Sequence, residues 1–124
     1  MSKQIDRRDI HKKFRKELSA GTAALVLLSL LAQSEEALYG YQIGKLVGAG
    51  EEEPELIKQG AIYPVLRSLE SSGLLSSYRE ASKSGPPRRY YQVTEEGKQV
   101  LEEWKAIWQE IKEFVDHRLK GKKE

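Results

Sequence analysis

The segment AIYPVLRSLESSGLL, residues 61–75, constrains the fold more than any other stretch of the chain. Its apolar residues recur every three or four positions, which is typical of the buried face of a helix: Ile62, Val65, Leu66 and Leu69. Pro64 lies inside this pattern, and a proline in a helix costs about 3 kcal/mol unless it lies near the N-terminal end. We therefore expect the helix to begin near residues 58–61 and to stop at Gly73.

The opposite face of this helix carries residue types that contact DNA. Gln59, Tyr63 and Arg67 fall at i, i+4 and i+8, so they project from one side. In a helix-turn-helix, the N-terminal residues of the second helix enter the major groove. Gln can pair with adenine, Arg with guanine, and Tyr can donate to phosphate. Gly60 and Ala61 would allow a close approach. The alternative is an ordinary solvated helix face.

Two earlier stretches are also predicted to be helical. The run TAALVLLSLLA, residues 22–32, is the most apolar part of the chain. It is shorter than the roughly 20 apolar residues that cross a bilayer, so we expect a buried core helix. This helix would start with Ser19 or Thr22 as its N-cap and end at Gln33, and a weaker helix would precede it over residues 7–17.

A second helix is predicted within SEEALYGYQIGKLVGAG, residues 34–50. One face would hold four apolar residues: Tyr39, Ile43, Leu46 and Val47. Tyr41, Gln42 and Lys45 lie off that face, and the helix would end at Gly48 and Gly50. The connector EEEPELI, residues 51–57, is longer than the tight turn of the simplest helix-turn-helix.

Two strand-like runs follow, LLSSYRE over residues 74–80 and RRYYQVT over residues 88–94. The Gly/Pro/Ser-rich segment between them predicts the tip of a β-hairpin. Lys83, Arg88 and Arg89 concentrate positive charge near this tip, where it could follow a phosphate backbone or reach the minor groove. The alternative is a solvated basic hairpin.

The last helix is predicted to begin at Thr94, with Glu95 and Glu96 near the positive end of its dipole. A heptad seam runs along it: Val100, Trp104, Ile107, Ile111 and Phe114. A second stripe lies beside this seam: Leu101, Trp108 and Val115. A small domain can cover only part of so wide an apolar face. We expect a second subunit to cover the rest, the alternative being packing within the chain.

Composition argues against most other chemistry. Charged residues make up 32% of the chain, but the formal net charge is only +2, so the balance alone indicates no partner. The first twenty residues carry seven basic and three acidic residues, a basic arm or a solvated terminus. There is no cysteine, and the two histidines are far apart, so we expect neither disulfide nor metal site. No signal peptide, phosphate loop or nucleophile motif is present, and we predict neither catalytic residues nor a cofactor.

The order of elements predicts a mainly α fold with a small β-hairpin (α+β), a winged helix-turn-helix with a long C-terminal dimerisation helix. Three motifs carry a resemblance to a known family: LYGYQIGKLV (38–47), IKQGAIYPVLRSLESSGLL (57–75) and GPPRRYYQVTEEGKQVL (85–101). In this order and at this separation, they make residues 19–117 resemble the PadR family of transcriptional regulators. The expected organisation is an arm or short helix over residues 1–18, the winged domain over 19–95, the dimerisation helix over 96–120 and a basic tail over 121–124.

The resemblance implies a dimeric bacterial regulator, usually a repressor, that dimerises through its last helix. In some drug-responsive relatives a tryptophan of this helix stacks on flat aromatic ligands, and Trp108 resembles it by its distance from Gly97. The alternative, which we favour, is that Trp108 is an interface anchor without a ligand.

We therefore predict a cytoplasmic, nucleoid-associated homodimer that binds an inverted-repeat operator in duplex DNA, with a small aromatic effector as a further expected partner that releases it. The alternative is a winged-helix protein–protein interaction module without DNA binding. The predicted DNA contacts come from both helices and the hairpin: Tyr41, Gln42, Lys58, Gln59, Gly60, Ala61, Tyr63, Pro64, Arg67, Lys83, Arg88 and Arg89.

Overall fold

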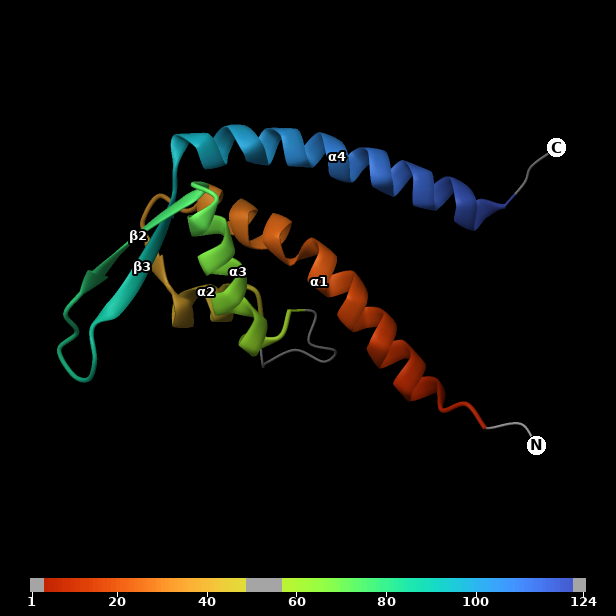
Figure 1. Ribbon diagram of the computed structural model, residues 1–124, viewed down its shortest axis with the longest axis horizontal. Coiled ribbons are helices and arrows are strands. Elements are labelled where there is room, and N and C mark those ends of the chain that lie inside the picture. The colour runs from red at the N-terminus through yellow and green to blue at the C-terminus, as the bar shows by residue number, and fades with distance from the viewer. Residues whose placement is uncertain (1–3, 49–56, 122–124) are drawn as a thin grey trace.

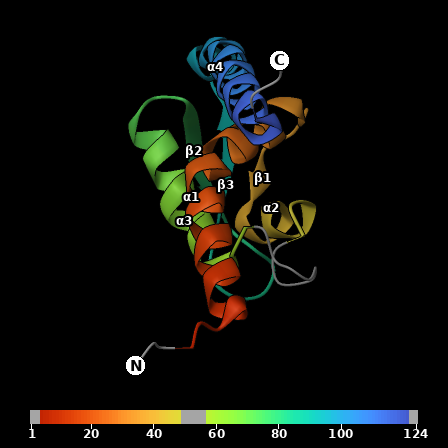
Figure 2. The ribbon, with the colours of Figure 1, turned by 90° about the vertical axis from the view of Figure 1, so that its right-hand side faces the viewer.

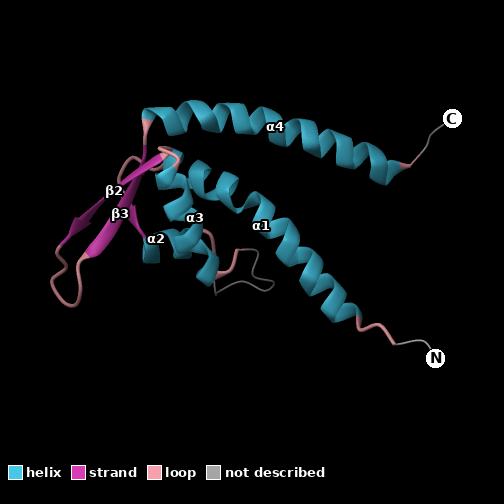
Figure 3. Ribbon diagram, in the orientation of Figure 1, coloured by secondary structure: helices cyan, strands magenta, loops and turns pink. Residues whose placement is uncertain are grey.

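Two long helices and a small sheet frame the molecule in the computed structural model, which describes residues 4–48 and 57–121. The elements follow the order α1 (Arg7–Gln33), β1 (Leu38–Tyr39), α2 (Gly40–Leu46), α3 (Gln59–Ser71), β2 (Leu75–Glu80), β3 (Arg88–Val93) and α4 (Glu95–Lys120). Figures 1 and 3 show α1 and α4 side by side near the sheet and diverging toward their far ends. The end-on view of Figure 2 places α4 above α1, with α2 and α3 to either side.

The sheet confirms the predicted α+β winged fold and adds a strand to it. β2 and β3 form the expected antiparallel hairpin, with Leu75 opposite Val93 and Glu80 opposite Arg88. β1 pairs with the other edge of β3, which gives the order β1-β3-β2. The sequence did not indicate β1, because a strand of two residues has no alternating pattern.

α1 is one continuous helix, which corrects the expected break before Ser19 or Thr22. The N-cap is Asp6, whose Oδ1 accepts the backbone N–H of Arg8 at 2.9 Å. The hydroxyls of Ser19 and Thr22 donate to carbonyls one turn earlier, at 2.7 and 3.2 Å, so they bond within the helix instead of capping it. The predicted weaker helix and core helix are therefore a single rod.

α2 is shorter than predicted and begins at Gly40. Tyr39 belongs to β1, and its backbone N–H donates to Oε1 of Gln42 at 3.0 Å. Ile43 is the apolar side chain of α2 that is fully buried, whereas Leu46 is 60% exposed. The predicted buried face is therefore wrong at Tyr39 and Leu46. Gly48 has φ +74°, in accord with the expected stop, and Gly50 lies outside the described residues.

α3 begins at Gln59 and ends as predicted at a glycine. Pro64 is the sixth residue of the helix, so its missing N–H removes a single intrahelical hydrogen bond, in accord with the expected position near the helix start. Gly73 adopts φ +82°, and its N–H donates to the carbonyl of Glu70 at 2.9 Å. The N–H of Leu74 donates to the carbonyl of Leu69 at 3.0 Å, which completes a Schellman motif.

The N-terminus of α4 and the segment that follows α3 are hydrogen-bonded to each other through Thr94. Thr94 caps α4 as predicted, because its Oγ1 accepts the N–H of Gly97 at 2.9 Å. The same hydroxyl donates to the carbonyl of Gly73 at 2.7 Å, and the Thr94 N–H donates to the carbonyl of Leu74 at 3.1 Å. A Cβ at Gly97 would overlap the carbonyl oxygen of Leu74. Glycine at this position lets α4 pack directly on the backbone before β2.

The core lies between α1, α3, the inner face of the sheet and the first turns of α4. Its largest fully buried side chains come from α1, α2, α3 and β3: Leu27, Leu28, Ile43, Ile62, Leu66 and Tyr91. Leu101 of α4 is also buried, at 4% exposure. In the described part of the chain, no helix is both long enough and apolar enough to span a membrane.

Candidate nucleic-acid interface

The outer face of α3 presents the three side chains that were predicted to project together. Gln59, Tyr63 and Arg67 are all exposed, and Tyr63 is 47% exposed despite its aromatic ring. Gly60 beside them has open space where a Cβ would stand, and Lys58 is exposed at the N-cap. This part of α3 therefore presents donors and acceptors with no bulky side chain at Gly60.

Tyr63 is held in place by a glycine of α2. A Cβ at Gly40 would overlap the hydroxyl and the outer ring carbons of Tyr63, so the ring lies directly against the backbone of this buried glycine. The contact joins the first turn of α2 to the exposed face of α3. It fixes the direction in which the phenol of Tyr63 points.

The two predicted contact residues of α2 have different environments. Tyr41 is 61% exposed and stacks on Tyr39 with ring centroids 6.5 Å apart, and Nζ of Lys45 lies 5.8 Å from the Tyr41 ring. Gln42 is half-buried and its carbonyl oxygen already accepts the Tyr39 N–H. The Gln42 side chain therefore acts first as a helix cap.

A row of tyrosines crosses the outer face of the sheet. Tyr78, Tyr90 and Tyr39 lie at matching positions on β2, β3 and β1, with centroids 5.5 Å apart for Tyr78–Tyr90 and 5.4 Å for Tyr39–Tyr90. The guanidinium of Arg88 lies 4.4 Å from the centroid of the Tyr39 ring. Stacking of this kind holds the arginine while leaving its N–H groups at the surface. The sequence did not indicate the row, because β1 brings Tyr39 into it.

We call residues 75–93 the wing. Its inner face carries Arg89. Nη1 of Arg89 donates to Oγ of Ser77 at 2.8 Å, and that hydroxyl donates to Oε2 of Glu70 at 2.6 Å. Both Arg89 and Glu70 are half-buried. Burial raises the pKa of the neighbouring Tyr91, the Glu70 carboxylate raises that pKa further, and Arg89 opposes the rise.

Arg79 lies directly opposite Arg89 in the register of the hairpin. It is exposed and was not among the predicted contacts, because the hairpin was predicted but its register was not. Alternation along β2 places Arg79 on the same face as Ser77 and Leu75. The only signal that could have identified Arg79 in advance was the hairpin register, which depends on the length of the tip.

An open groove of about 710 Å³ lies between the wing and helices α2 and α3. Three tyrosines and three arginines line it: Tyr39, Tyr41, Tyr63, Arg79, Arg88 and Arg89. The remaining described lining residues are serines and prolines of the tip, so the groove is basic. Lys83 is exposed at the tip itself. The groove thus brings the predicted contacts Tyr41 and Tyr63 of the helices together with Arg88 and Arg89 of the hairpin.

A second surface, apolar instead of basic, lies where α1 and α4 diverge. Five predicted dimerisation residues are 40% or more exposed: Ile107, Trp108, Ile111, Phe114 and Val115. Leu101 is corrected, since it is buried in the chain's own core, and Val100 and Trp104 pack partly against that core. α1 adds exposed apolar residues with the same helical spacing: Ile10, Phe14 and Leu18.

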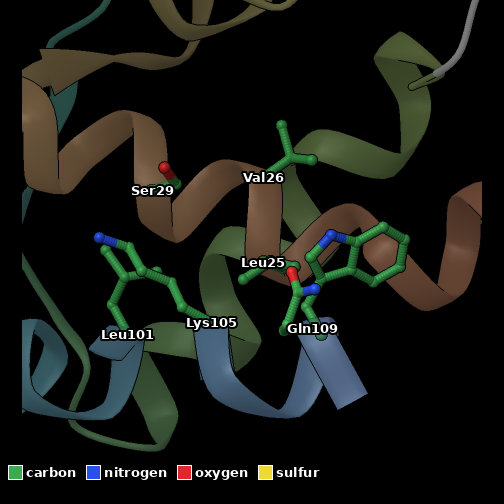
Figure 4. Close-up of a pocket in the computed structure, with 7 residues that line it drawn as sticks. Leu25, Val26, Ser29, Leu101, Lys105 and Gln109 are labelled. Atoms are coloured by element: carbon green, nitrogen blue, oxygen red, sulfur yellow. The ribbon is translucent and has the colours of Figure 1, made fainter. Parts of the chain in front are cut away.

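Trp108 lies beside a hollow between these helices. Leu25, Val26 and Ser29 of α1 and Leu101, Lys105 and Gln109 of α4 complete the lining, as Figure 4 shows. The hollow measures about 430 Å³ and is open to solvent. Its walls are mainly apolar, so a flat ring or an apolar side chain from another molecule would fit.

The geometry defines a class of protein. A helix with an exposed polar N-terminal half, next to an arginine-rich β-hairpin on a three-helix core, is a winged helix-turn-helix of the DNA-binding type. The profile of the transcriptional regulator PadR-like family matches residues 27–103. The chain belongs to this family, and it is a transcriptional regulator, not an enzyme.

Solved structures agree with this assignment. A PadR family transcriptional regulator from Eggerthella lenta DSM 2243 is 34% identical, with a TM-score of 0.78, over 94% of this chain and 97% of that one. One from Clostridium difficile R20291 is 34% identical, with a TM-score of 0.62, over 79% and 98%. PadR of Bacillus subtilis, solved in complex with operator DNA, is 25% identical, with a TM-score of 0.57, over 67% and 46%. A search of the curated proteins gave no match.

Proposed function

We propose that the chain is a sequence-specific repressor that binds duplex DNA through the outer face of α3 and the wing. The observation that carries this proposal is the basic groove in which Tyr63 of α3 meets the arginines of the wing. Gln59 and Arg67 are exposed at helical spacing from Tyr63 on the same face of α3. The operator complex of Bacillus subtilis PadR supports it, because that protein shares the fold and binds DNA. Such a regulator acts in the cytoplasm, at the nucleoid.

The groups divide into base contacts and phosphate contacts. Gln59 and Arg67 project from α3 and can form bidentate pairs with adenine and guanine, each providing about 1–3 kcal/mol of discrimination. Tyr63 and Tyr41 carry hydroxyls suited to phosphate, and Arg88 and Lys83 add positive charge on the wing. With roughly 6–10 phosphate contacts per dimer, affinity should fall about 10³–10⁵-fold between 50 and 200 mM salt.

The test separates the two kinds of contact on one duplex. The wild-type protein first selects a duplex from a random library, and binding is measured by fluorescence anisotropy on that duplex and on a scrambled one. Arg88→Ala should weaken binding to both duplexes alike and lower the salt slope. Arg67→Ala and Gln59→Ala should reduce the preference for the selected duplex at particular base pairs.

Two results would contradict this assignment. Equal losses on both duplexes for all three variants would move Arg67 and Gln59 to the phosphate contacts. Absence of binding to any duplex at 50 mM salt would favour the alternative, a winged-helix protein–protein interaction module.

A homodimer is part of the proposal, because the second half of α4 exposes an apolar stripe with heptad spacing. A twofold dimer would present two α3 helices to major-groove sites about 34–36 Å apart. The operator should then be an inverted repeat. The exposed apolar side chains of α1 lie on the diverging partner of this helix and would extend the same interface.

An aromatic effector is a further part of the proposal and rests on the hollow beside Trp108. A flat apolar compound that does not itself bind duplex DNA should quench tryptophan fluorescence and weaken DNA binding by favouring a dimer with wrongly spaced α3 helices. Trp104→Phe serves as the control that leaves Trp108 as the only tryptophan. A Trp108→Ala dimer that still binds DNA and still responds to the compound would rule out this role.

A further inference from the structure

The two arginines of the inner wing face have different surroundings, although they lie directly opposite each other on paired strands. Arg89 is half-buried and is hydrogen-bonded through Ser77 to Glu70. Arg79 is exposed beside the basic groove. Like charges at directly opposite positions repel each other, so something must neutralise one of them. The carboxylate of Glu70, two hydrogen bonds away, supplies the charge of opposite sign.

We propose that Arg89 is a positioning residue that locks the wing to α3 through Ser77 and Glu70, and that Arg79 is the inner-face arginine that meets phosphate. This inference rests on the proposed function, since it assigns roles within a DNA-binding surface. It replaces the expected phosphate role of Arg89 and adds a contact residue that sequence patterns did not indicate.

The chain of hydrogen bonds connects three elements at one point. Glu70 lies in the last turn of α3, Ser77 in β2 and Arg89 in β3. The Ser77 hydroxyl suits the central place, because it accepts from the guanidinium and donates to the carboxylate at once. Hydrogen bonds to charged groups are the stronger kind, and these are partly shielded from water.

The consequence is a fixed angle between the wing and the recognition surface. Arg67 lies one turn before Glu70 on α3, so the lock joins the base-contacting helix to the strand that carries the tip. Without the lock, the wing could rotate relative to α3, and the two would no longer fit one duplex together. Losing the lock should weaken binding without removing a phosphate contact.

Two measurements test the assignment: the salt dependence of DNA binding, and the direction in which Glu70→Gln changes DNA affinity. On the selected duplex, Arg79→Gln should lower the salt slope by about one per subunit. Arg89→Gln should weaken binding about tenfold with the slope unchanged. Glu70→Gln removes a negative charge near DNA, so simple electrostatics predicts tighter binding, whereas loss of the lock predicts weaker binding.

Matched variants separate the lock from general damage. Ser77→Ala should reproduce the effect of Arg89→Gln, and Ser77→Thr, which keeps the hydroxyl, should restore wild-type affinity. Glu70→Gln combined with Arg89→Gln should be no weaker than the weaker single variant, because both changes break one unit. Melting temperatures of all variants are measured in parallel, and the same non-additivity should be found there.

Three outcomes would overturn the proposal. These are a slope change for Arg89→Gln equal to that for Arg79→Gln, tighter binding by Glu70→Gln, or additive losses in the double variant. A wild-type protein that binds no duplex would instead overturn the proposed function and the role of Arg79. The melting-temperature cycle would still decide whether Glu70 and Arg89 are coupled, since it needs no DNA.

Discussion

Gly97 and Gly40 occupy places where a missing side chain lets two elements touch. At Gly97 the neighbour is rigid, because a Cβ would overlap the backbone carbonyl of Leu74 and approach a methyl group of Val93. At Gly40 the neighbour is the flexible end of Tyr63. The same substitution should therefore have different effects at the two sites, on stability at the first and on function at the second.

Gly97→Ala should destabilise the fold by about 1–3 kcal/mol, since the joint between α4 and β2 must open to admit a methyl group. Thermal or urea unfolding measures this loss. Gly60→Ala is the matched control, because a Cβ there meets open space and alanine should stabilise a helix by about 0.4–1 kcal/mol. A Gly97→Ala protein as stable as the wild type would show that the joint is looser than its geometry indicates.

Gly40→Ala should leave the melting temperature nearly unchanged and weaken DNA binding, because the Tyr63 ring can swing away from the new methyl group but loses its fixed direction. Anisotropy on the selected duplex provides the measurement. In a Tyr63→Ala background the Gly40 substitution should have no further effect. A further loss in that background would mean that Gly40 acts through another group.

At the scale of elements, α4 has two halves with different partners. Its first turns are capped by Thr94 and buried through Leu101, whereas its later turns expose a stripe of large apolar side chains. α1 is divided in the same way, with a buried second half and exposed Ile10, Phe14 and Leu18 in its first half. One half of each helix therefore packs in the core, and the other half exposes an apolar surface that a partner would bury.

Ile111→Glu combined with Phe114→Glu should convert the proposed dimer to a folded monomer, because these side chains are 48% and 62% exposed in the single chain. Trp104 is a poorer choice, since it packs against the chain's own core. Light scattering gives the mass, and circular dichroism checks the fold. Ala106→Glu places one carboxylate on an exposed position off the stripe and should remain dimeric. A double variant that stays dimeric would place the interface elsewhere.

For the whole molecule, the sequence predicted what depends on local patterns. The apolar spacing of α3, its stop at Gly73, the hairpin and the Thr94 cap all follow from residues near one another. The unbroken α1 did not follow, because a serine or threonine hydroxyl can either cap a helix or bond back one turn. β1, the tyrosine row and the pairing of Arg79 with Arg89 depend on how distant segments meet, and no local pattern records that.

The joint at Thr94 makes α4 a lever arm for α3. One hydroxyl links Gly73, two residues after α3 ends, to the first turn of α4, and Gly97 packs on the backbone of Leu74, so we expect the two helices to turn as one body. α4 has 26 residues, which makes the arm about 39 Å long. If the body formed by α3 and α4 rotates by a few degrees when the far end of α4 is displaced, α3 moves by ångströms. Spin-label distances between the two α3 helices of the proposed dimer, with and without the proposed effector, would record that movement directly.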